Sequence, residues 1–143
     1  MIRGRPQYPD ANGTLRLTAG TVRGYVPGDG AAYVPFTTLE GLLQKETGLS
    51  PFASPPAVLE AVRRHDHGRW ADPALGSVPV NFMSDVDTTG GNSGSPALNG
   101  RGELIGLLFD GVWEDLAGDF LYNPVTSRSI LVDIRYVLWY LDR

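Results

Sequence analysis

The chain has 143 residues, of which 42% are hydrophobic and 20% charged, and this composition is typical of one globular domain with a sizeable core. The net charge of −4 excludes a strongly basic surface, and no apolar run is long enough to span a membrane, so we expect neither nucleic acid nor membrane as a partner. Because the chain has no cysteine, disulfides and thiolate metal sites are excluded.

The first part of the chain predicts turns and strands. Residues 1–13 contain several turn-forming residues and predict coil. Apolar residues alternate with polar ones over 14–25, which predicts one long strand, or two strands with a bend at Gly20. We expect a turn over 27–30 and a short strand over 31–36.

Two short helices are predicted next. The first covers 38–46, with the hydroxyl of Thr37 or Thr38 as its N-cap and Gly48 as its stop. The second covers 56–64 and begins with a proline, which suits the first turn of a helix. A segment rich in proline and serine separates them and predicts a linker.

The second half of the chain predicts mainly strands. We expect a strand over 78–83 and a hairpin over 96–109, whose Asn99-Gly100 dipeptide favours a tight turn. A strand over 129–132 runs into an apolar helix over 134–141 that has no C-terminal cap. With 18 glycines and 11 prolines, the pattern indicates a mostly β fold with a few short helices.

The predicted hairpin follows the most informative segment, Gly-Asn-Ser-Gly-Ser-Pro at 91–96. A serine between small residues, at a turn that leads into an apolar strand, is the typical setting of an acyl-transfer nucleophile. Glycine accepts backbone conformations closed to other residues, so such a loop can turn its amides toward one point. Ser93 is therefore a candidate nucleophile, and the N–H groups of Gly91 and Ser93 are candidate oxyanion-hole donors.

Other loop types fit this segment poorly. Ser95 stands where a nucleophile elbow requires glycine, and no Gly-Lys-Ser/Thr follows to make a phosphate-binding loop. A calcium loop that starts at Asp85 fails, because Thr89 occupies position five and Pro96 occupies position twelve, where a glutamate is needed. On spacing alone, a glycine-rich hairpin loop in which Ser93 has no chemical role stays open.

A serine nucleophile needs a base, and the chain offers two histidines, His65 and His67. They follow the second predicted helix and are expected to form its solvated polar end, where positive charge suits the helix dipole. A His-Asp-His cluster can bind a metal weakly, but the sequence shows no third ligand, so we expect neither a metal nor another cofactor. Ser93 thus has no evident base in this chain.

The segments 91–96 and 102–107 together resemble the nucleophile region of chymotrypsin-fold serine peptidases. Over nearly the whole chain, the sequence also resembles the C-terminal part of the bacterial dipeptidyl-peptidase 7 and 11 family. This resemblance implies a serine-type exopeptidase that removes dipeptides from the free N-termini of peptide substrates, with a chymotrypsin-like double β-barrel joined to a helical domain. Seven segments carry it: 8–12, 15–18, 35–38, 80–82, 89–96, 109–111 and 132–138.

The resemblance also assigns roles to three residues. Ser93 is the implied nucleophile, and the amides of Gly91 and Ser93 form the implied oxyanion hole. Family members that cut after acidic residues carry an arginine just beyond a Phe-Asp pair, where this chain has Gly111. Glycine at this place implies an open, uncharged S1 pocket that accepts bulky apolar side chains.

The same resemblance implies that the chain is incomplete. We expect residues 1–143 to form the nucleophile-bearing half of the barrel and a C-terminal helix. The catalytic His and Asp come from the first barrel in this family, and that barrel and the helical domain are missing here. We expect an inactive, poorly soluble fragment of a periplasmic or secreted parent that forms a homodimer, although this chain carries no signal peptide.

Two other functions stay open. An endopeptidase of the HtrA or glutamyl type shares the fold but needs no helical domain to hold a substrate amino group. A fragment or binding module without enzymatic activity is the second alternative, and it would leave Ser93 unreactive toward a fluorophosphonate probe.

Several conspicuous side chains are expected to have structural roles. Asp133 and Arg135 predict an ion pair or a strand-to-helix cap. Glu114, Asp115 and Asp119 predict a solvated loop, which the resemblance places at the edge of the parent's substrate cleft. Four aromatic residues are expected to pack: Trp113, Tyr122, Trp139 and Tyr140.

Overall fold

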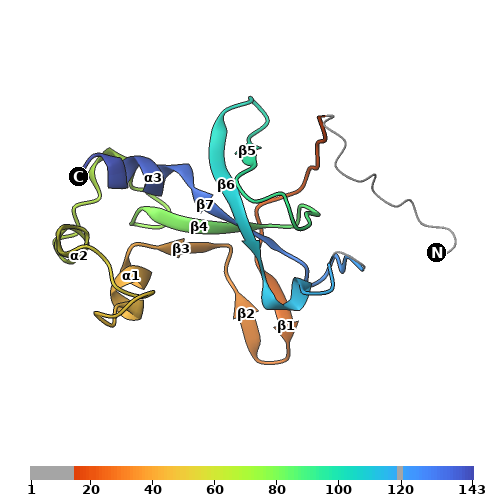
Figure 1. The fold of residues 1–143 in the computed structure, drawn as a ribbon, viewed down its shortest axis with the longest axis horizontal. Helices are drawn as coiled ribbons and strands as arrows, with labels where there is room; N and C mark the ends of the chain where they lie inside the picture. Colours follow the sequence, from red (N-terminus) through yellow and green to blue (C-terminus); the bar gives the residue numbers. More distant parts are fainter. Residues whose placement is uncertain (1–14, 119–120) are drawn as a thin grey trace, which may run out of the picture.

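The computed structural model of this protein describes residues 15–118 and 121–143 (Figure 1). The predicted coil over 1–13, and with it the family-like segment 8–12, lies outside the described residues. The central feature is one antiparallel sheet of five strands in the order β3-β4-β7-β6-β5. Its strands are β3 (Phe36–Thr38), β4 (Pro79–Ser84), β5 (Pro96–Leu98), β6 (Leu104–Gly111) and β7 (Ser129–Asp133).

This sheet is open. Its edges are β3 and β5, which pair with no further strand among the described residues. A separate hairpin of β1 (Tyr25–Gly28) and β2 (Ala31–Tyr33) extends away from the sheet, with its turn at Asp29-Gly30 as predicted (Figure 1). The prediction of a mostly β fold with a few short helices is confirmed. The described residues form no closed barrel, so the chymotrypsin-like half-barrel stays a prediction.

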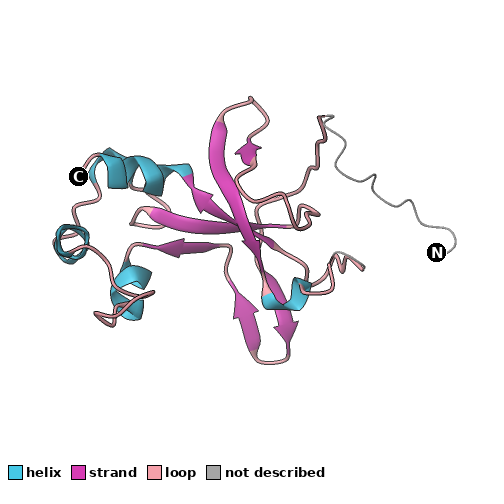
Figure 2. Cartoon of the chain, viewed as in Figure 1, coloured by secondary structure: helices cyan, strands magenta, loops and turns pink. Residues whose placement is uncertain are grey.

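The three α-helices gather at one end of the sheet (Figure 2). They are α1 (Glu40–Lys45), α2 (Pro56–Arg63) and α3 (Ile134–Leu141), and two 3₁₀ turns, η1 (Gly68–Trp70) and η2 (Trp113–Asp115), complete the helical elements of the described chain. No helix over 15–118 or 121–143 has the length and apolar character needed to cross a membrane.

Two hydrophobic clusters hold these elements together. The larger one joins the helices to the start of β4 and centres on Trp139, which is fully buried and whose indole Nε1 donates a hydrogen bond to the carbonyl oxygen of Asp66 (2.8 Å). Each fully buried aliphatic side chain in such a cluster stabilises the fold by roughly 1.5–3 kcal/mol. The smaller cluster lies on the sheet and comprises Phe82, Leu108 and Leu131, from β4, β6 and β7.

The predicted strand over 14–25 is wrong for most of its length, and residue 14 itself lies outside the described residues. Residues 15–24 contain only an isolated bridge between Val22 and Ser84, and the side chains of Leu15 and Leu17 are 88% exposed. An alternating pattern becomes a strand only where a partner can pair with it. In the described chain, this segment pairs only at Val22, with the last residue of β4.

The predicted helices are confirmed, but the N-cap of the first one is wrong. Leu39 is the N-cap of α1 and makes no capping hydrogen bond through its side chain. Thr38 belongs to β3, and the hydroxyl of Thr37 accepts a hydrogen bond from the Asn81 amide (3.2 Å). Both threonines therefore belong to the sheet and neither caps the helix. Gly48 has a positive φ of 71° but lies beyond the helix end.

The predicted elements of the second half are confirmed: β4, the β5–β6 hairpin, β7 and α3. The predicted Asp133–Arg135 pair is confirmed too, because Asp133 Oδ1 accepts hydrogen bonds from the Arg135 amide (2.9 Å) and Nε (3.0 Å) and so caps α3. Trp113 does not pack, since it is 81% exposed. Tyr122 is partly buried and its hydroxyl donates to the carbonyl oxygen of Asp85 (2.7 Å). Asp119 lies outside the described residues.

Candidate active site

Ser93 lies in the loop between β4 and β5, and this loop is tightly turned. Gly91 and Gly94 have φ values of 95° and 86°, in the left-handed region that favours glycine. Asn92 braces the turn, because its side-chain Oδ1 accepts from the Thr89 amide (2.9 Å) while its own amide donates to the Thr89 carbonyl (3.2 Å). The glycines beside the serine are therefore required by the backbone path.

Two backbone hydrogen bonds anchor the loop to the sheet. The Gly94 amide donates to the Leu108 carbonyl (2.7 Å), and the Leu108 amide donates to the Ser95 carbonyl (3.0 Å). Leu108 is buried in the cluster on the sheet. The serine thus sits on a rigid element, which a positioned nucleophile requires.

The amides of Gly91 and Ser93 are available to a ligand. Among the described residues, no hydrogen bond uses either of these N–H groups, whereas the amides of Asn92, Gly94 and Ser95 are all engaged. Ser93 is exposed, and its hydroxyl has no hydrogen-bond partner in the described part of the chain. Unengaged donors held by a fixed turn are what an oxyanion hole needs.

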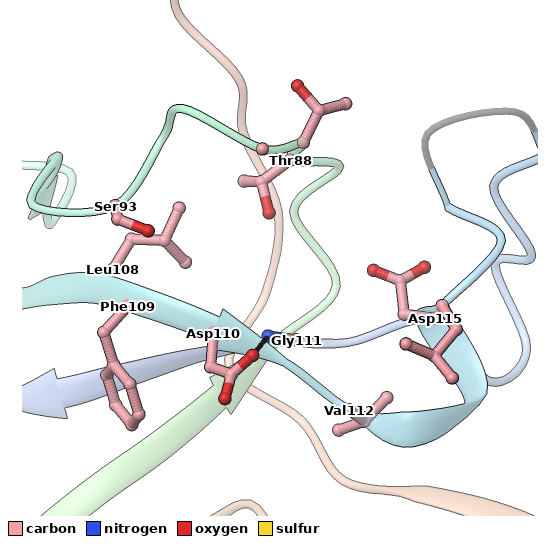
Figure 3. A pocket seen from close by; sticks show the side chains of 11 residues that line it. Thr88, Ser93, Leu108, Phe109, Asp110, Gly111, Val112 and Asp115 are labelled. Carbon is pink, nitrogen blue, oxygen red and sulfur yellow. Dashed lines mark hydrogen bonds between the residues drawn. The ribbon is translucent and has the colours of Figure 1, made fainter.

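A cavity of about 280 Å³ opens beside Ser93 (Figure 3). Gly111, at the end of β6, lines the same cavity, so the structure brings these two predicted site residues together. A methyl group at Gly111 would meet Asp115 Oδ2 at 3.4 Å, an ordinary contact, and so the glycine leaves this wall open. The remaining lining residues are Thr88, Thr89, Gly90, Leu108, Phe109, Asp110, Val112, Asp115 and Leu116.

An irregularity in β6 shapes this wall. Leu108 faces Leu131 of β7, but Asp110 faces Ile130, so Phe109 is an extra residue in β6 and forms a bulge. A bulge interrupts the alternation of side chains, which re-aims the residues that follow it. Asp110 and Gly111 follow the bulge and line the cavity, and no pattern in the sequence predicts the bulge.

A buried arginine supports the far end of this wall. Arg128 is 1% exposed, and its carbonyl oxygen accepts from the amide of Val112 (2.9 Å). Its guanidinium donates to the carbonyl oxygens of Gly24, Pro124 and Val125, each at 3.2 Å, and so ties the β1 region to the segment before β7. Sequence reasoning missed this residue. Its partners are backbone carbonyl groups, which every residue type has, so the sequence contains no pattern that would reveal a buried arginine here.

The cavity is electrostatically negative, because it is lined by two carboxylates and by no cationic side chain among the described residues. Asp110 accepts a hydrogen bond from the Gly111 amide (2.8 Å), but the buried Oδ1 of Asp115 has no hydrogen-bond partner in the described chain. Burial raises the pKa of nearby Asp87, and the Asp115 carboxylate raises it further. Sequence reasoning placed Asp115 at the edge of the cleft, whereas the structure places it in the cavity wall.

The two histidines lie elsewhere. Neither lines the cavity beside Ser93, and both lie next to Glu40 at the start of α1. Glu40 is a candidate third ligand that sequence spacing did not reveal, because it lies in α1, far from the two histidines in the sequence. The described residues therefore supply a nucleophile candidate and two amide donors but no base.

Taken together, the turned serine loop, its unengaged amides and the adjoining cavity are features of a serine-peptidase site. The sequence model of the Peptidase S46 family matches residues 1–143, and the chain belongs to this family.

The similar proteins are named either dipeptidyl-peptidase 7 or Asp/Glu-specific dipeptidyl-peptidase. The chain is 48% identical to dipeptidyl-peptidase 7 of Phocaeicola vulgatus over 100% of its own length and 20% of that protein's. It is 49% identical to an Asp/Glu-specific dipeptidyl-peptidase of Porphyromonas gingivalis, over 96% of its own length and 19% of that protein's. Among solved structures, it resembles Porphyromonas endodontalis DPP11 in complex with the dipeptide Arg-Glu, with a TM-score of 0.89 and 45% sequence identity. This match covers 99% of the present chain and 20% of the DPP11 chain.

These findings confirm the predicted family. The chain spans about a fifth of the length of the curated relatives that it matches, which agrees with the expectation of a part of a larger protein.

Proposed function

We propose that this chain carries the nucleophile of a serine-type dipeptidyl-peptidase that removes dipeptides from the free N-termini of peptides. The observation that carries the proposal is that Ser93 and Gly111 line one cavity, and that Ser93 belongs to a turn in which its own amide and that of Gly91 are unengaged, in a chain of the Peptidase S46 family. In this proposal, residues 1–143 are the C-terminal part of the catalytic domain, and the open sheet is half of a chymotrypsin-like barrel.

The proposed chemistry follows from the loop geometry. Ser93 Oγ attacks the scissile carbonyl carbon while a histidine from outside this chain removes the hydroxyl proton. The N–H groups of Gly91 and Ser93 donate to the oxyanion of the tetrahedral intermediate. The intermediate collapses as the C–N bond breaks and the same histidine protonates the leaving amine, and water then releases the dipeptide from the acyl-enzyme.

In this proposal, the part of the cavity lined by Gly111 binds the side chain of the substrate residue that precedes the cleaved bond. We propose an open S1 pocket that accepts apolar side chains, and the Asp110 and Asp115 carboxylates support the exclusion of acidic ones by like-charge repulsion. Relatives named for Asp/Glu specificity and relatives named dipeptidyl-peptidase 7 match this chain with similar identity, so overall similarity does not choose between them. A preference for basic side chains is a second candidate, which the acidic residues Asp110 and Asp115 in the cavity lining favour.

The test uses the full-length protein and the 143-residue chain side by side. A fluorophosphonate probe should label the full-length protein at Ser93 and leave the isolated chain unlabelled, since the chain lacks a base. Ser93→Ala should lower kcat of the full-length enzyme by at least about 10³-fold on dipeptide reporters. Acetylation of the substrate amino group should abolish cleavage, whereas continued cleavage would show an endopeptidase. Strong labelling of the isolated chain would contradict the proposal.

A further inference from the structure

Three side chains with metal-binding atoms meet at the helical end of the molecule. Glu40 begins α1, and His65 and His67 lie in the loop between α2 and η1. One oxygen of Glu40 and one ring nitrogen of each histidine all lie within 4.8 Å of one another. Glu40 Oε1 is 3.5 Å from His67 Nε2 and 3.9 Å from His65 Nδ1.

These distances are close to those of a zinc site. With metal–ligand bonds of about 2.0–2.1 Å, the ligand atoms of a tetrahedral site lie about 3.3 Å apart. The separations of Glu40 Oε1 from the two histidine nitrogens, 3.5 and 3.9 Å, exceed this value, and the two nitrogens lie within 4.8 Å of each other, so rotation of the exposed His65 side chain would complete the site. Glu40, His65 and His67 together supply three ligands, and this number leaves one tetrahedral position for water.

His67 gives a second, independent observation. Its Nε2 is buried and has no hydrogen-bond partner among the described residues. The separation of 3.5 Å from Glu40 Oε1 is longer than an N–H···O hydrogen bond. Buried polar nitrogens in folded proteins are nearly always partnered, so this atom is suited to a ligand that the amino acids around it do not provide.

The loop that carries the histidines is held in place by α3. Trp139 Nε1 donates to the Asp66 carbonyl (2.8 Å), and Arg143 pairs with the Asp66 carboxylate (3.1 Å). His65 adopts φ of 53°, which is uncommon for a residue other than glycine. The two imidazole rings are thereby set at 88° to each other with centroids 5.8 Å apart. A loop fixed in this way needs little reorganisation to bind an ion.

We propose that Glu40, His65 and His67 bind one divalent transition-metal ion, with Zn²⁺ as the best match. Two imidazoles and one carboxylate form a donor set that zinc accepts, and such a set suits Mg²⁺ or Ca²⁺ less well, because these ions prefer oxygen. The bound ion cross-links α1 to the loop between α2 and η1. This proposal does not depend on the role of Ser93. Ion pairs of Glu40 with both histidines are the alternative, but they leave the buried His67 Nε2 without a hydrogen-bond partner.

The test measures metal binding directly. Metal-free full-length protein is titrated with ZnCl₂ in a calorimeter and with CoCl₂ in a visible spectrometer, and we expect one ion per chain and the strong absorption of tetrahedral cobalt. His65→Asn is the main variant, because His65 is exposed and asparagine tolerates positive φ, so the fold is kept. It should weaken zinc binding at least about tenfold, and Glu40→Gln and His67→Gln should do the same.

The matched control is Glu60→Gln, which removes the same charge from α2. Glu60 is exposed and pairs with Arg64 (3.8 Å), so zinc affinity should not change. Zinc at one fixed concentration should also raise the Tm of the unsubstituted full-length protein and of its Glu60 variant by more than that of its His65 variant. A stoichiometry well below one ion per chain, or equal affinity in the His65 and Glu40 variants and the unsubstituted chain, would overturn the proposal.

Discussion

Gly111 and Asp115 determine the character of the cavity beside Ser93. Gly111 adds no side chain, and Asp115 adds a carboxylate whose Oδ1 is buried without a partner among the described residues. An acidic substrate side chain in this cavity would meet a like charge. The proposed preference against acidic residues therefore depends on a specific carboxylate as well as on the missing arginine.

Asp115→Asn tests this charge in the full-length enzyme. Two kinds of substrate are compared, those with Asp or Glu before the cleaved bond and those with Leu there. Removing one like charge from the cavity should raise the ratio of their kcat/KM values about tenfold in favour of the acidic substrates, since the repulsion is on the order of 1–2 kcal/mol. The kcat/KM ratio on paired dipeptide reporters is the measurement. Glu114→Gln is the control, because Glu114 is bonded to the Tyr25 hydroxyl (2.7 Å) and does not line the cavity. An unchanged ratio would show that Asp115 does not contribute to the S1 pocket.

The positive φ of Gly91 gives a second test at the residue scale. Gly91→Ala forces a side chain into a conformation that costs about 1–2 kcal/mol, so the loop will shift its amides. Kcat of the full-length enzyme should fall about 10²-fold with little change in KM. Gly30→Ala is the matched control, since Gly30 has φ of 76° and equal open space but lies in the β1–β2 turn. Equal losses of kcat in both variants would contradict an oxyanion role.

At the scale of secondary structure, an ion cluster joins α3 to the neighbouring loop. Arg135 donates to Asp133 Oδ2 (2.8 Å) and to Asp72 Oδ2 (2.7 Å), and Asp133 is buried. The hydrogen bond from Arg135 lowers the pKa of Asp72, and the Ala74 amide lowers it further. A carboxyl group whose pKa is lower in the folded state stabilises the fold above its unfolded pKa of about 4, and this stabilisation is lost as the pH falls.

Arg135→Gln should therefore destabilise the fold by about 1–3 kcal/mol at neutral pH, because it leaves the buried Asp133 carboxylate without its cation. It should also flatten the dependence of stability on pH between about 5 and 2, since the Asp72 pKa rises toward its ordinary value. Urea unfolding at several pH values measures both effects. Arg101→Gln is the control, because its ion pair with Glu103 lies exposed on the hairpin turn and should matter by less than about 0.5 kcal/mol.

The same scale shows where sequence reasoning succeeds. The β5–β6 hairpin and α3 follow from local signals, an Asn-Gly turn and an apolar helical run, and both are confirmed. The strand predicted over 14–25 needed a partner that no local pattern reveals. The bulge at Phe109 and the approach of Glu40 to the two histidines are long-range as well. Tertiary contacts decide these features, so one sequence predicts the serine loop but not the charges around it.

At the scale of the whole molecule, the open sheet leaves apolar surface uncovered. A groove of about 550 Å³ runs along it, and its lining includes the exposed side chains of Leu17 and Val22. The edge strand β5 presents Leu98, which is 57% exposed, and unpaired edges of this kind recruit other strands. Because the chain spans about a fifth of its relatives' length, this surface fits a role as an interior face of a larger protein.

The isolated chain should therefore self-associate. We expect an apparent mass above that of one chain by size-exclusion chromatography with light scattering, together with binding of a hydrophobic dye. Leu98→Lys places a charge on the β5 edge and should shift the distribution toward monomer, whereas Leu49→Lys changes a residue that is 73% exposed in the loop between α1 and α2 and should not. A monodisperse monomer that melts cooperatively would show that the sheet needs no partner, and the uncovered groove would then require another explanation.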